Sequence, residues 1–116
     1  MEYGNLEITD NVLKDIAMKS LADFQDEDVS DPKVVKKLRK MVDVERLDDQ
    51  TLNVNVKVSV KFGEVIPDYV KKLQDKIASD LESLTGLKVA SVNVTVEEVI
   101  LKTPTVEEKE EEESPE

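Results

Sequence analysis

The chain has 116 residues, with 27 acidic and 16 basic side chains, a formal net charge of -11, and neither cysteine nor histidine. This length suits one domain with one modest core, and the two missing residue types exclude disulfide, thiolate and imidazole chemistry. No apolar run approaches the roughly 20 residues that a membrane span needs, and no secretory signal is recognisable at the N-terminus. We therefore expect a cytoplasmic protein without direct membrane insertion.

The negative charge is concentrated at the C-terminal end. Residues 103–116 hold seven glutamates and one lysine, or -6, which leaves -5 on residues 1–102. Low hydrophobicity and self-repulsion predict a single domain at 1–102 followed by a disordered acidic tail at 103–116. The tail is either an interaction segment or, more simply, a solvating extension. Neither part has the excess of lysine and arginine that nucleic-acid binding requires, so we expect no nucleic-acid partner.

The N-terminal part is expected to form a short edge strand and two helices. The edge strand is predicted at Asn5 to Ile8, and Thr9 or Asp10 is predicted to cap the first helix. Asp31 followed by Pro32 favours the start of a second helix. The apolar stripes are Val12, Leu13, Ile16, Ala17, Leu21 and Phe24 in the first helix, and Val34, Val35 and Leu38 in the second.

The segment after the second helix allows two interpretations. Met41 and Val42 would extend the helical stripe, whereas Val42 and Val44 also alternate as in a strand. We favour a strand over residues 41–46 that forms a hairpin with the next strand, because a long half-buried strand benefits from a neighbour.

The strongest pattern in the chain is a strand that alternates strictly between apolar and polar residues. Its apolar positions are Leu52, Val54, Val56, Val58, Val60 and Phe62. This period of two predicts one face on the core and one face in water. Gly63 supplies a turn, and Pro67 suits the first turn of a helix.

An amphipathic helix and a second alternating strand follow. The helix is predicted from Ile66 to a C-cap at Gly86, with the apolar stripe Ile66, Val70, Leu73, Ile77, Leu81 and Leu84. The strand carries its apolar residues at Ala90, Val92, Val94 and Val96. The parity then changes to Val99 and Leu101, which favours a bulge near Glu97 and Glu98 or the end of pairing.

These elements predict an α+β fold. We expect a small mixed sheet of three to four strands with two or three helices packed on one face, built round a β-hairpin and a β-α-β unit. The uncovered face would present small, mostly neutral side chains, namely Asn53, Asn55, Ser59, Ser91, Asn93 and Thr95. Plain solvation is the simpler interpretation of this face, and a surface for a partner or for self-association is the alternative.

No catalytic, cofactor-binding or metal-binding residue is predicted. The acidic loop Asp26, Glu27, Asp28 and Asp31 resembles a calcium loop, but Asp31 stands where such a loop needs glycine and Lys37 where it needs glutamate. We expect a solvated loop that caps the second helix. Two carboxylate pairs, Asp48 with Asp49 and Glu97 with Glu98, are candidates for acid-base chemistry. Adjacent residues on a strand point to opposite faces, and adjacent turn residues are usually solvated. Neither carboxylate pair is therefore expected to act as a general acid and base.

Several motifs together resemble the alkaline shock protein family of envelope stress response proteins. They are GNLEITDNVLKDIA at residues 4–17, the turn KFGEVIP, the helix YVKKLQDKIASDLESLTGL and the strand VASVNVTVEEV. The similarity is strongest over residues 54–99. The chain departs from the family at DFQDEDVSDPKVV, where a glycine-valine pair is usual after the first helix.

The resemblance implies a cytoplasmic bacterial protein with no established catalytic activity, linked to cell-envelope stress. In some members of the family a separate anchor protein holds the protein at the inner face of the membrane. We therefore expect a non-enzymatic structural or adaptor protein with protein partners, including a membrane-anchored one, and weak homo-oligomers. The alternative is a small enzyme or ligand-binding domain that uses carboxylate or lysine side chains.

Overall fold

The structure is a computed structural model, and it describes residues 3–101. Its elements are α1 (Asp10–Gln25), α2 (Pro32–Met41), β1 (Val42–Arg46), β2 (Thr51–Lys61), α3 (Ile66–Thr85) and β3 (Lys88–Ile100). The described residues form one sheet in the order β1-β2-β3, with β1 antiparallel and β3 parallel to β2. The predicted α+β fold, with its hairpin and its β-α-β unit, is confirmed. The predicted acidic tail lies outside the described residues.

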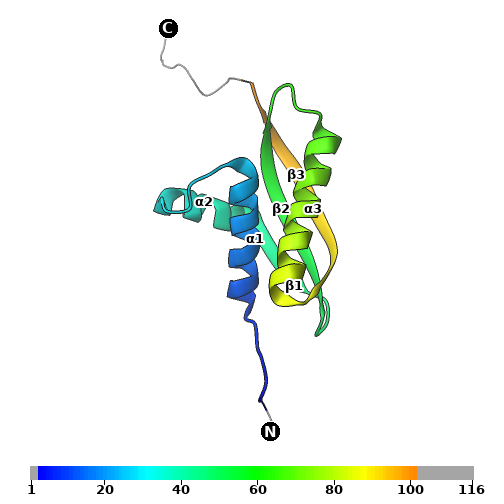
Figure 1. Cartoon of the computed structure of the whole chain (residues 1–116). Helices are drawn as coiled ribbons and strands as arrows, with labels where there is room; N and C mark the ends of the chain where they lie inside the picture. The colour runs from blue at the N-terminus through cyan, green and yellow to red at the C-terminus, as the bar shows by residue number, and fades with distance from the viewer. Residues whose placement is uncertain (1–2, 102–116) are drawn as a thin grey trace.

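Two layers make up the domain. The helices α1 and α3 lie side by side across one face of the sheet, and α2 projects sideways from the edge where β1 begins (Figure 1). β2 lies between β1 and β3, so it is the one strand in the described sheet with a neighbour on each side. The order of the strands therefore places the most strictly alternating segment of the sequence at the centre.

The core forms between β2 and the two covering helices. Every second residue of β2 is at most 2% exposed, namely Leu52, Val54, Val56, Val58 and Val60. The helices contribute fully buried residues at Leu13, Ala17 and Leu21 of α1 and at Leu73, Ile77 and Leu81 of α3. Burial of a valine or leucine side chain contributes about 1.5 to 3 kcal/mol, so this row supplies much of the driving force for folding.

Local chain signals set the ends of the helices. The Thr9 hydroxyl caps α1 by accepting from the Val12 amide at 3.4 Å, and the Asp31 carboxylate caps α2 by accepting from the Lys33 amide at 2.9 Å. Gly86 ends α3 with a φ of 75°, a left-handed conformation that suits glycine. Helix α2 extends to Met41 and β1 starts at Val42, so this strand begins one residue later than the sequence predicts.

β3 pairs with β2 through two irregularities. Val58 pairs with Val96 and Ser59 pairs with Glu98, so Glu97 is an extra residue, and the predicted bulge is confirmed. A second shift, which the sequence did not indicate, occurs where Leu52 pairs with Val89 and Asn53 with Ser91. It leaves Ala90 exposed instead of in the core.

The predicted edge strand at Asn5 to Ile8 is wrong. These residues form no strand, and Leu6 is 86% exposed. The Ile8 carbonyl accepts a hydrogen bond from the Arg46 guanidinium. A side chain, and not a neighbouring strand, therefore binds the backbone of the segment at that point.

Several predicted core positions near the ends of elements are exposed. Val12 is 45%, Ile66 38%, Leu84 70% and Phe62 75% exposed. Val12 lies in the first turn of α1, and Ile66 and Leu84 lie at the two ends of α3, where the apolar period continues but the covering layer does not. Phe62 lies in the turn that follows the last residue of β2.

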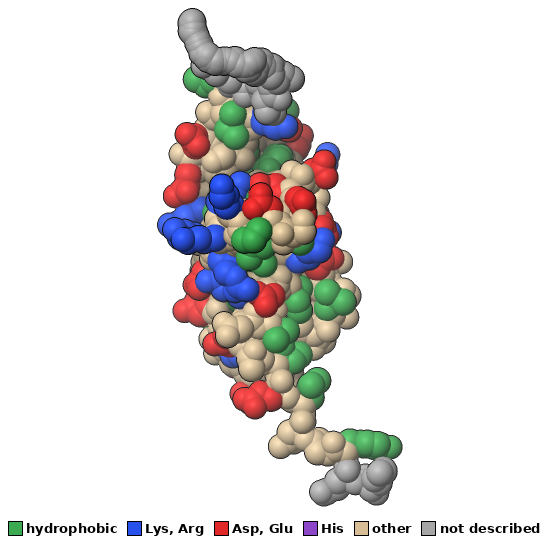
Figure 2. All heavy atoms as spheres, turned by 90° about the vertical axis from the view of Figure 1, so that its left-hand side faces the viewer, with side chains coloured by type: hydrophobic (Ala, Val, Ile, Leu, Met, Phe, Trp, Pro, Cys, Tyr) green, Lys and Arg blue, Asp and Glu red, His purple; other side chains and the backbone are tan. Residues whose placement is uncertain are grey.

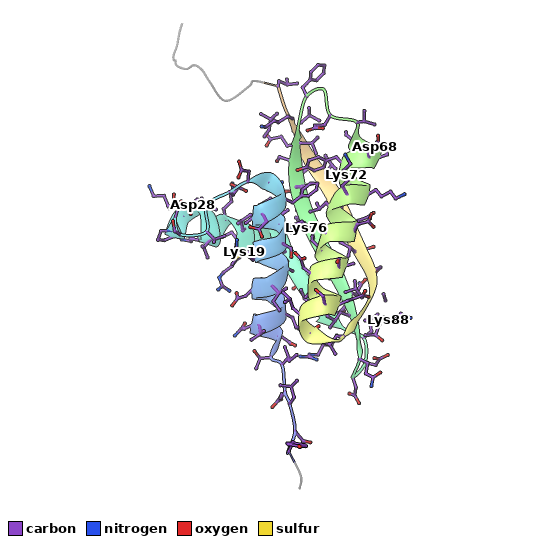
Figure 3. All side chains as sticks on the ribbon, viewed as in Figure 1. Lys19, Asp28, Asp68, Lys72, Lys76 and Lys88 are labelled. Atoms are coloured by element: carbon purple, nitrogen blue, oxygen red, sulfur yellow. The ribbon has the colours of Figure 1, made fainter. Side chains whose placement is uncertain are left out.

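One polar cluster joins α1 to α3. The Ser20 hydroxyl, 1% exposed, donates to Asp80 Oδ2 at 2.6 Å, and Lys76 Nζ donates to the same oxygen at 3.1 Å. Lys76 lies on the side of α3 that faces α1 (Figure 3). Burial opposes ionisation of Asp80, but the hydrogen bonds from Ser20 and Lys76 and the charge of Lys76 outweigh it, so the pKa of Asp80 lies below its ordinary value.

Leu73→Ala should lower the free energy of unfolding by about 2 to 5 kcal/mol, because Leu73 is fully buried and its truncation leaves a cavity beneath β2. Leu84→Ala makes the same chemical change on the same helix at a position 70% exposed, and should cost less than about 0.5 kcal/mol. Urea unfolding measures both. Equal midpoints for the two variants would contradict the assigned faces of α3.

Ser20→Ala should lower the free energy of unfolding at pH 7 by about 1.5 kcal/mol, the low end for a hydrogen bond to a charged group. The folded-state pKa of Asp80 is depressed, so its contribution is present above the ordinary value of 3.8 and is lost as the pH falls through the folded value. The cost of Ser20→Ala should therefore shrink as the pH falls below 3.8 and through the folded-state pKa of Asp80.

The matched control is Ser83→Ala, because the exposed Ser83 hydroxyl bonds the Asp80 backbone carbonyl at 3.3 Å and not its carboxylate. Urea unfolding at neutral and acid pH should show a pH-dependent difference for Ser20→Ala alone. The same loss for Ser20→Ala at both pH values would refute the assigned role of Asp80.

Candidate functional site

The face of the sheet opposite α1 and α3, here called the open face, is the strongest candidate for a functional surface. The predicted residues Asn53, Asn55 and Ser59 of β2 and Ser91, Asn93 and Thr95 of β3 all lie on it. Asn55, Ser91, Asn93 and Thr95 are exposed, and Asn53 and Ser59 are half-buried. Parity on β2 and the register of β3 place these six side chains on one surface.

Four of the six residues form a connected hydrogen-bond cluster across β2 and β3. Asn93 Nδ2 donates to Asn53 Oδ1 at 3.3 Å and to Asn55 Oδ1 at 3.1 Å, and the Ser91 hydroxyl donates to Asn53 Oδ1. Asn53 is paired with Ser91 and Asn55 with Asn93 in the ladder, so the contacts follow directly from the strand register. The result is a neutral, polar and ordered centre.

The other two predicted residues lie nearer one end and face charged side chains. Thr95 is paired with Lys57, and Ser59 is paired with Glu98, whose Oε1 accepts from the Ser59 hydroxyl at 3.4 Å. Strand parity alone places Lys57 on this face. Glu98 reaches it only because Glu97 is a bulge, so a regular strand pattern does not reveal it.

β1 adds charge to the other margin of the open face. Asp43 is paired with Asn55 and Glu45 with Asn53, and both carboxylates are exposed. The open face therefore has neutral amides and hydroxyls at its centre and charged groups along its margins. The low charge at the centre is a feature that protein interfaces share, although their centres are usually more apolar than this one.

Edges of the sheet adjoin this face. Among residues 3–101, β3, which has 13 residues, pairs along one side only, with β2. β1 pairs with residues 52–56 of β2, so within the described sheet the rest of β2 has a ladder partner only in β3. Unpaired backbone groups along an edge offer hydrogen bonds to another strand.

The acidic loop before α2 is explained by local bonding. Asp28 Oδ1 accepts from the Ser30 amide at 2.9 Å and from its hydroxyl at 2.7 Å, and these bonds lower the pKa of Asp28. Glu27 forms an ion pair with Lys37 at 2.7 Å, and Asp31 caps α2. The loop thus stabilises a turn and a helix start, as its sequence predicts.

The carboxylate pair at Asp48 and Asp49 belongs to the turn between β1 and β2. Asp48 Oδ1 accepts from the Gln50 amide at 2.8 Å, and this bond, with a further one involving Thr51, lowers the pKa of Asp48. A general base or acid at neutral pH needs a pKa near the working pH, and the shift here goes the other way. The hydrogen bonds account for Asp48 as a turn residue.

A shallow depression of about 640 Å³ lies between the N-terminal segment and the end of α3, lined in part by Arg46, Asp49 and Thr85. Arg46 is the one basic side chain in its lining, and Asp10 Oδ1 accepts from Arg46 Nε at 2.7 Å. The guanidinium also bonds the Ile8 carbonyl, so Arg46 ties the start of α1 and the segment before it to the end of β1.

Neither a cluster of metal ligands nor a membrane-spanning helix is found among the described residues. Over residues 3–101, no group of three or more histidine, cysteine, aspartate or glutamate side chains is arranged to hold a metal ion. No helix in that part of the chain has the length and apolar character needed to cross a membrane.

In comparison with known proteins, neither a curated protein nor a solved structure matches the chain. The model of one protein family covers residues 1–101, which include every described element. The family is the one that the sequence motifs indicated, and its name refers to a protein and not to the aspartate at position 23. The chain belongs to the Asp23 family, described as having a cell envelope-related function.

Proposed function

We propose that this protein is a non-enzymatic structural or adaptor module of the cell envelope response, and that it works by binding protein partners through the open face. Membership of the Asp23 family supports the link to the envelope. The observation that carries the binding proposal is the neutral cluster of Asn53, Asn55, Ser91 and Asn93, which lies across two neighbouring strands and beside an edge of β3 that pairs with no other described strand.

The hydrogen bonds within the cluster favour binding. Side chains that are already held in place lose less conformational entropy when a partner covers them, which improves affinity for the same contact area. Asn55 and Asn93 each have unused donor or acceptor capacity, since a primary amide offers two N–H donors and an acceptor with two lone pairs. A partner can bond these groups without first breaking the cluster.

The partners that we propose are a second copy of this chain and a membrane-anchored protein. In a homodimer, the edge of β3 or the open face would meet its counterpart, and the neutral centre of the open face adds little repulsion between copies. The protein itself would be cytoplasmic and would reach the membrane through its anchored partner. The net charge of -11 opposes self-association, so we expect the dimer to be weak and to strengthen as salt screens the charge.

The alternative of a small enzyme or ligand-binding domain that uses carboxylates or lysines remains a prediction. The local hydrogen bonds of Asp28 and Asp48 account for these two carboxylates without catalysis. The partner-binding proposal rests on the open face and not on the absence of a catalytic group.

Asn55→Arg should weaken self-association, because it inserts a long charged side chain into the neutral centre of the open face. Sedimentation at several protein concentrations, with salt raised to about 0.1 M where the Debye length is about 10 Å, measures the monomer-dimer equilibrium. Wild type should gain mass with concentration, and Asn55→Arg should remain monomeric.

The matched control is Asn11→Arg, which makes the same change at an exposed position of α1, on the opposite side of the sheet. Both variants reduce the net negative charge equally, so charge alone would strengthen association in both. A strictly monomeric wild type at high concentration, or equal weakening by the two variants, would overturn the proposed contact. Capture of an envelope protein by wild type and by Asn11→Arg, but not by Asn55→Arg, would support the same face in adaptor binding.

A further inference from the structure

Helix α2 is strongly basic in an acidic protein. Its ten residues include the five cations Lys33, Lys36, Lys37, Arg39 and Lys40. Two of them are neutralised, because Lys37 pairs with Glu27 at 2.7 Å and Arg39 with Asp15 at 2.9 Å. Within the described part of the chain, Lys33, Lys36 and Lys40 have no carboxylate within ion-pair distance.

The free lysines line a groove. A hollow of about 480 Å³ is bounded by Lys33, Lys36, Lys37, Lys40 and Met41 of α2, by Lys57 of β2 and by Glu97 of β3. Five of these seven side chains are cationic and one is anionic. Figure 2 shows basic side chains gathered on the side of the molecule from which α2 projects. The groove is therefore a concave surface with a marked excess of positive charge, and it fits an extended anionic chain.

The topology creates this groove. Val42 and Val56 form the last pair between β1 and β2, and α2 ends one residue before Val42. β1 therefore pairs with β2 only as far as Val56, and beyond that point α2, instead of a strand, lies beside this edge of β2. Lys57 is the next residue of β2; it pairs with Thr95 of β3 on one side, and on the side where β1 has ended it lines the hollow together with α2.

The described end of β3 lies near the groove, and an anionic segment follows it in the sequence. Residues 103–116 contain seven glutamates and one lysine. β3 ends at Ile100, which is paired with Lys61 of β2. Lys61 lies four residues along β2 from Lys57. Four strand residues span about 13 Å, whereas the six peptide steps from Leu101 to Glu107 extend to about 20 Å. The first glutamates can therefore reach the groove by turning back.

We propose that residues 107–116 bind in the basic groove of α2 in the same molecule, through ion pairs with Lys33, Lys36, Lys40 and Lys57. Charge complementarity and reach select this occupant over an external anion, because a tethered segment has a high effective concentration at a nearby site. Glu97 would repel the segment at one side of the groove, which favours contacts on the α2 side. This inference goes beyond the proposed function and does not depend on it.

The contact should be weak and sensitive to salt. Exposed ion pairs contribute little individually and are screened as ionic strength rises. Deletion of residues 103–116 should consequently leave the melting temperature nearly unchanged. A measurement of proximity is therefore needed, and a test of stability would not be informative.

The chain contains no cysteine, so Ser114→Cys provides a single attachment point for a nitroxide spin label. In the full-length protein labelled with nitrogen-15, the label should broaden the amide signals of α2 at low salt, with much smaller losses of intensity in α3. The selective broadening should disappear near 1 M salt, where the Debye length is about 3 Å. Equal broadening of α2 and α3, or broadening that persists at 1 M salt, would overturn the proposal.

Two triple variants test whether the lysines of the groove, and not positive charge in general, bind the acidic segment. The triple change Lys33→Gln, Lys36→Gln and Lys40→Gln should abolish the selective broadening. The matched change Lys71→Gln, Lys72→Gln and Lys88→Gln removes the same charge from exposed positions on α3 and at the start of β3, and should not. Lys72 and Lys88 are well separated from α2 (Figure 3). Equal loss in both triple variants would indicate non-specific attraction and refute the groove.

A second test changes only residues outside the described fold. Replacement of the four glutamates at positions 110–113 by glutamine, in the spin-labelled chain, should reduce the selective broadening of α2. A sample that mixes isotope-labelled molecules without the spin label and spin-labelled molecules without the isotope reports contacts between molecules. Absence of broadening in this sample supports binding within one molecule, whereas broadening as strong as in the doubly labelled chain would overturn it in favour of a second copy.

Discussion

The packing of one row of β2 side chains against α1 and α3 is the interaction on which the rest of the structure depends. Leu52, Val54, Val56, Val58 and Val60 are almost completely buried, and both covering helices direct their own buried leucines toward the same layer. Because side chains alternate along a strand, fixing this row also fixes the opposite row. A slip of one residue would bury Asn53, Asn55 and Lys57, at a high cost in unpaired polar groups.

The open face is therefore a consequence of the core. With the valine row held inward, Asn53 and Asn55 must point outward, and the parallel register brings Ser91 and Asn93 opposite them. The hydrogen bonds among these residues need no additional element. In the described sheet β3 has no second neighbour, and the pairing of β1 with β2 stops at Val56. The surfaces that we propose for partners and for residues 107–116 adjoin these two edges.

Most of the fold was predictable from the sequence, because its strongest signals are local. The period of two in β2, the caps at Thr9, Asp31 and Gly86, and the parity change that marks the bulge at Glu97 depend only on nearby residues. The errors occur where tertiary contacts decide. The sequence around Asn5 to Ile8 does not reveal that Arg46 bonds the Ile8 carbonyl. The apolar period at Leu84 does not reveal that the layer packed against α3 ends before this residue.

The candidate site was predictable to a similar degree. Parity placed all six predicted residues on the open face, but their contacts with one another required the register of β3. The second register shift near Ala90 had no signal in the sequence, since Val89 and Ala90 are both apolar. The basic groove combines α2, Lys57 and Glu97, which lie far apart in the chain, and net charge alone concealed it.

Native-state hydrogen exchange in increasing urea tests most directly whether β2 and its buried row of side chains form the most stable part of the fold. The hydrogen-bonded amides of β2 should share the largest opening free energy, and this value should equal the global free energy of unfolding. Amides of α2 and of the end of β3 should exchange through smaller openings. Exchange of the β2 amides at a lower free energy than those of α1 would show that the helices form the stable unit without the sheet, and would contradict the account.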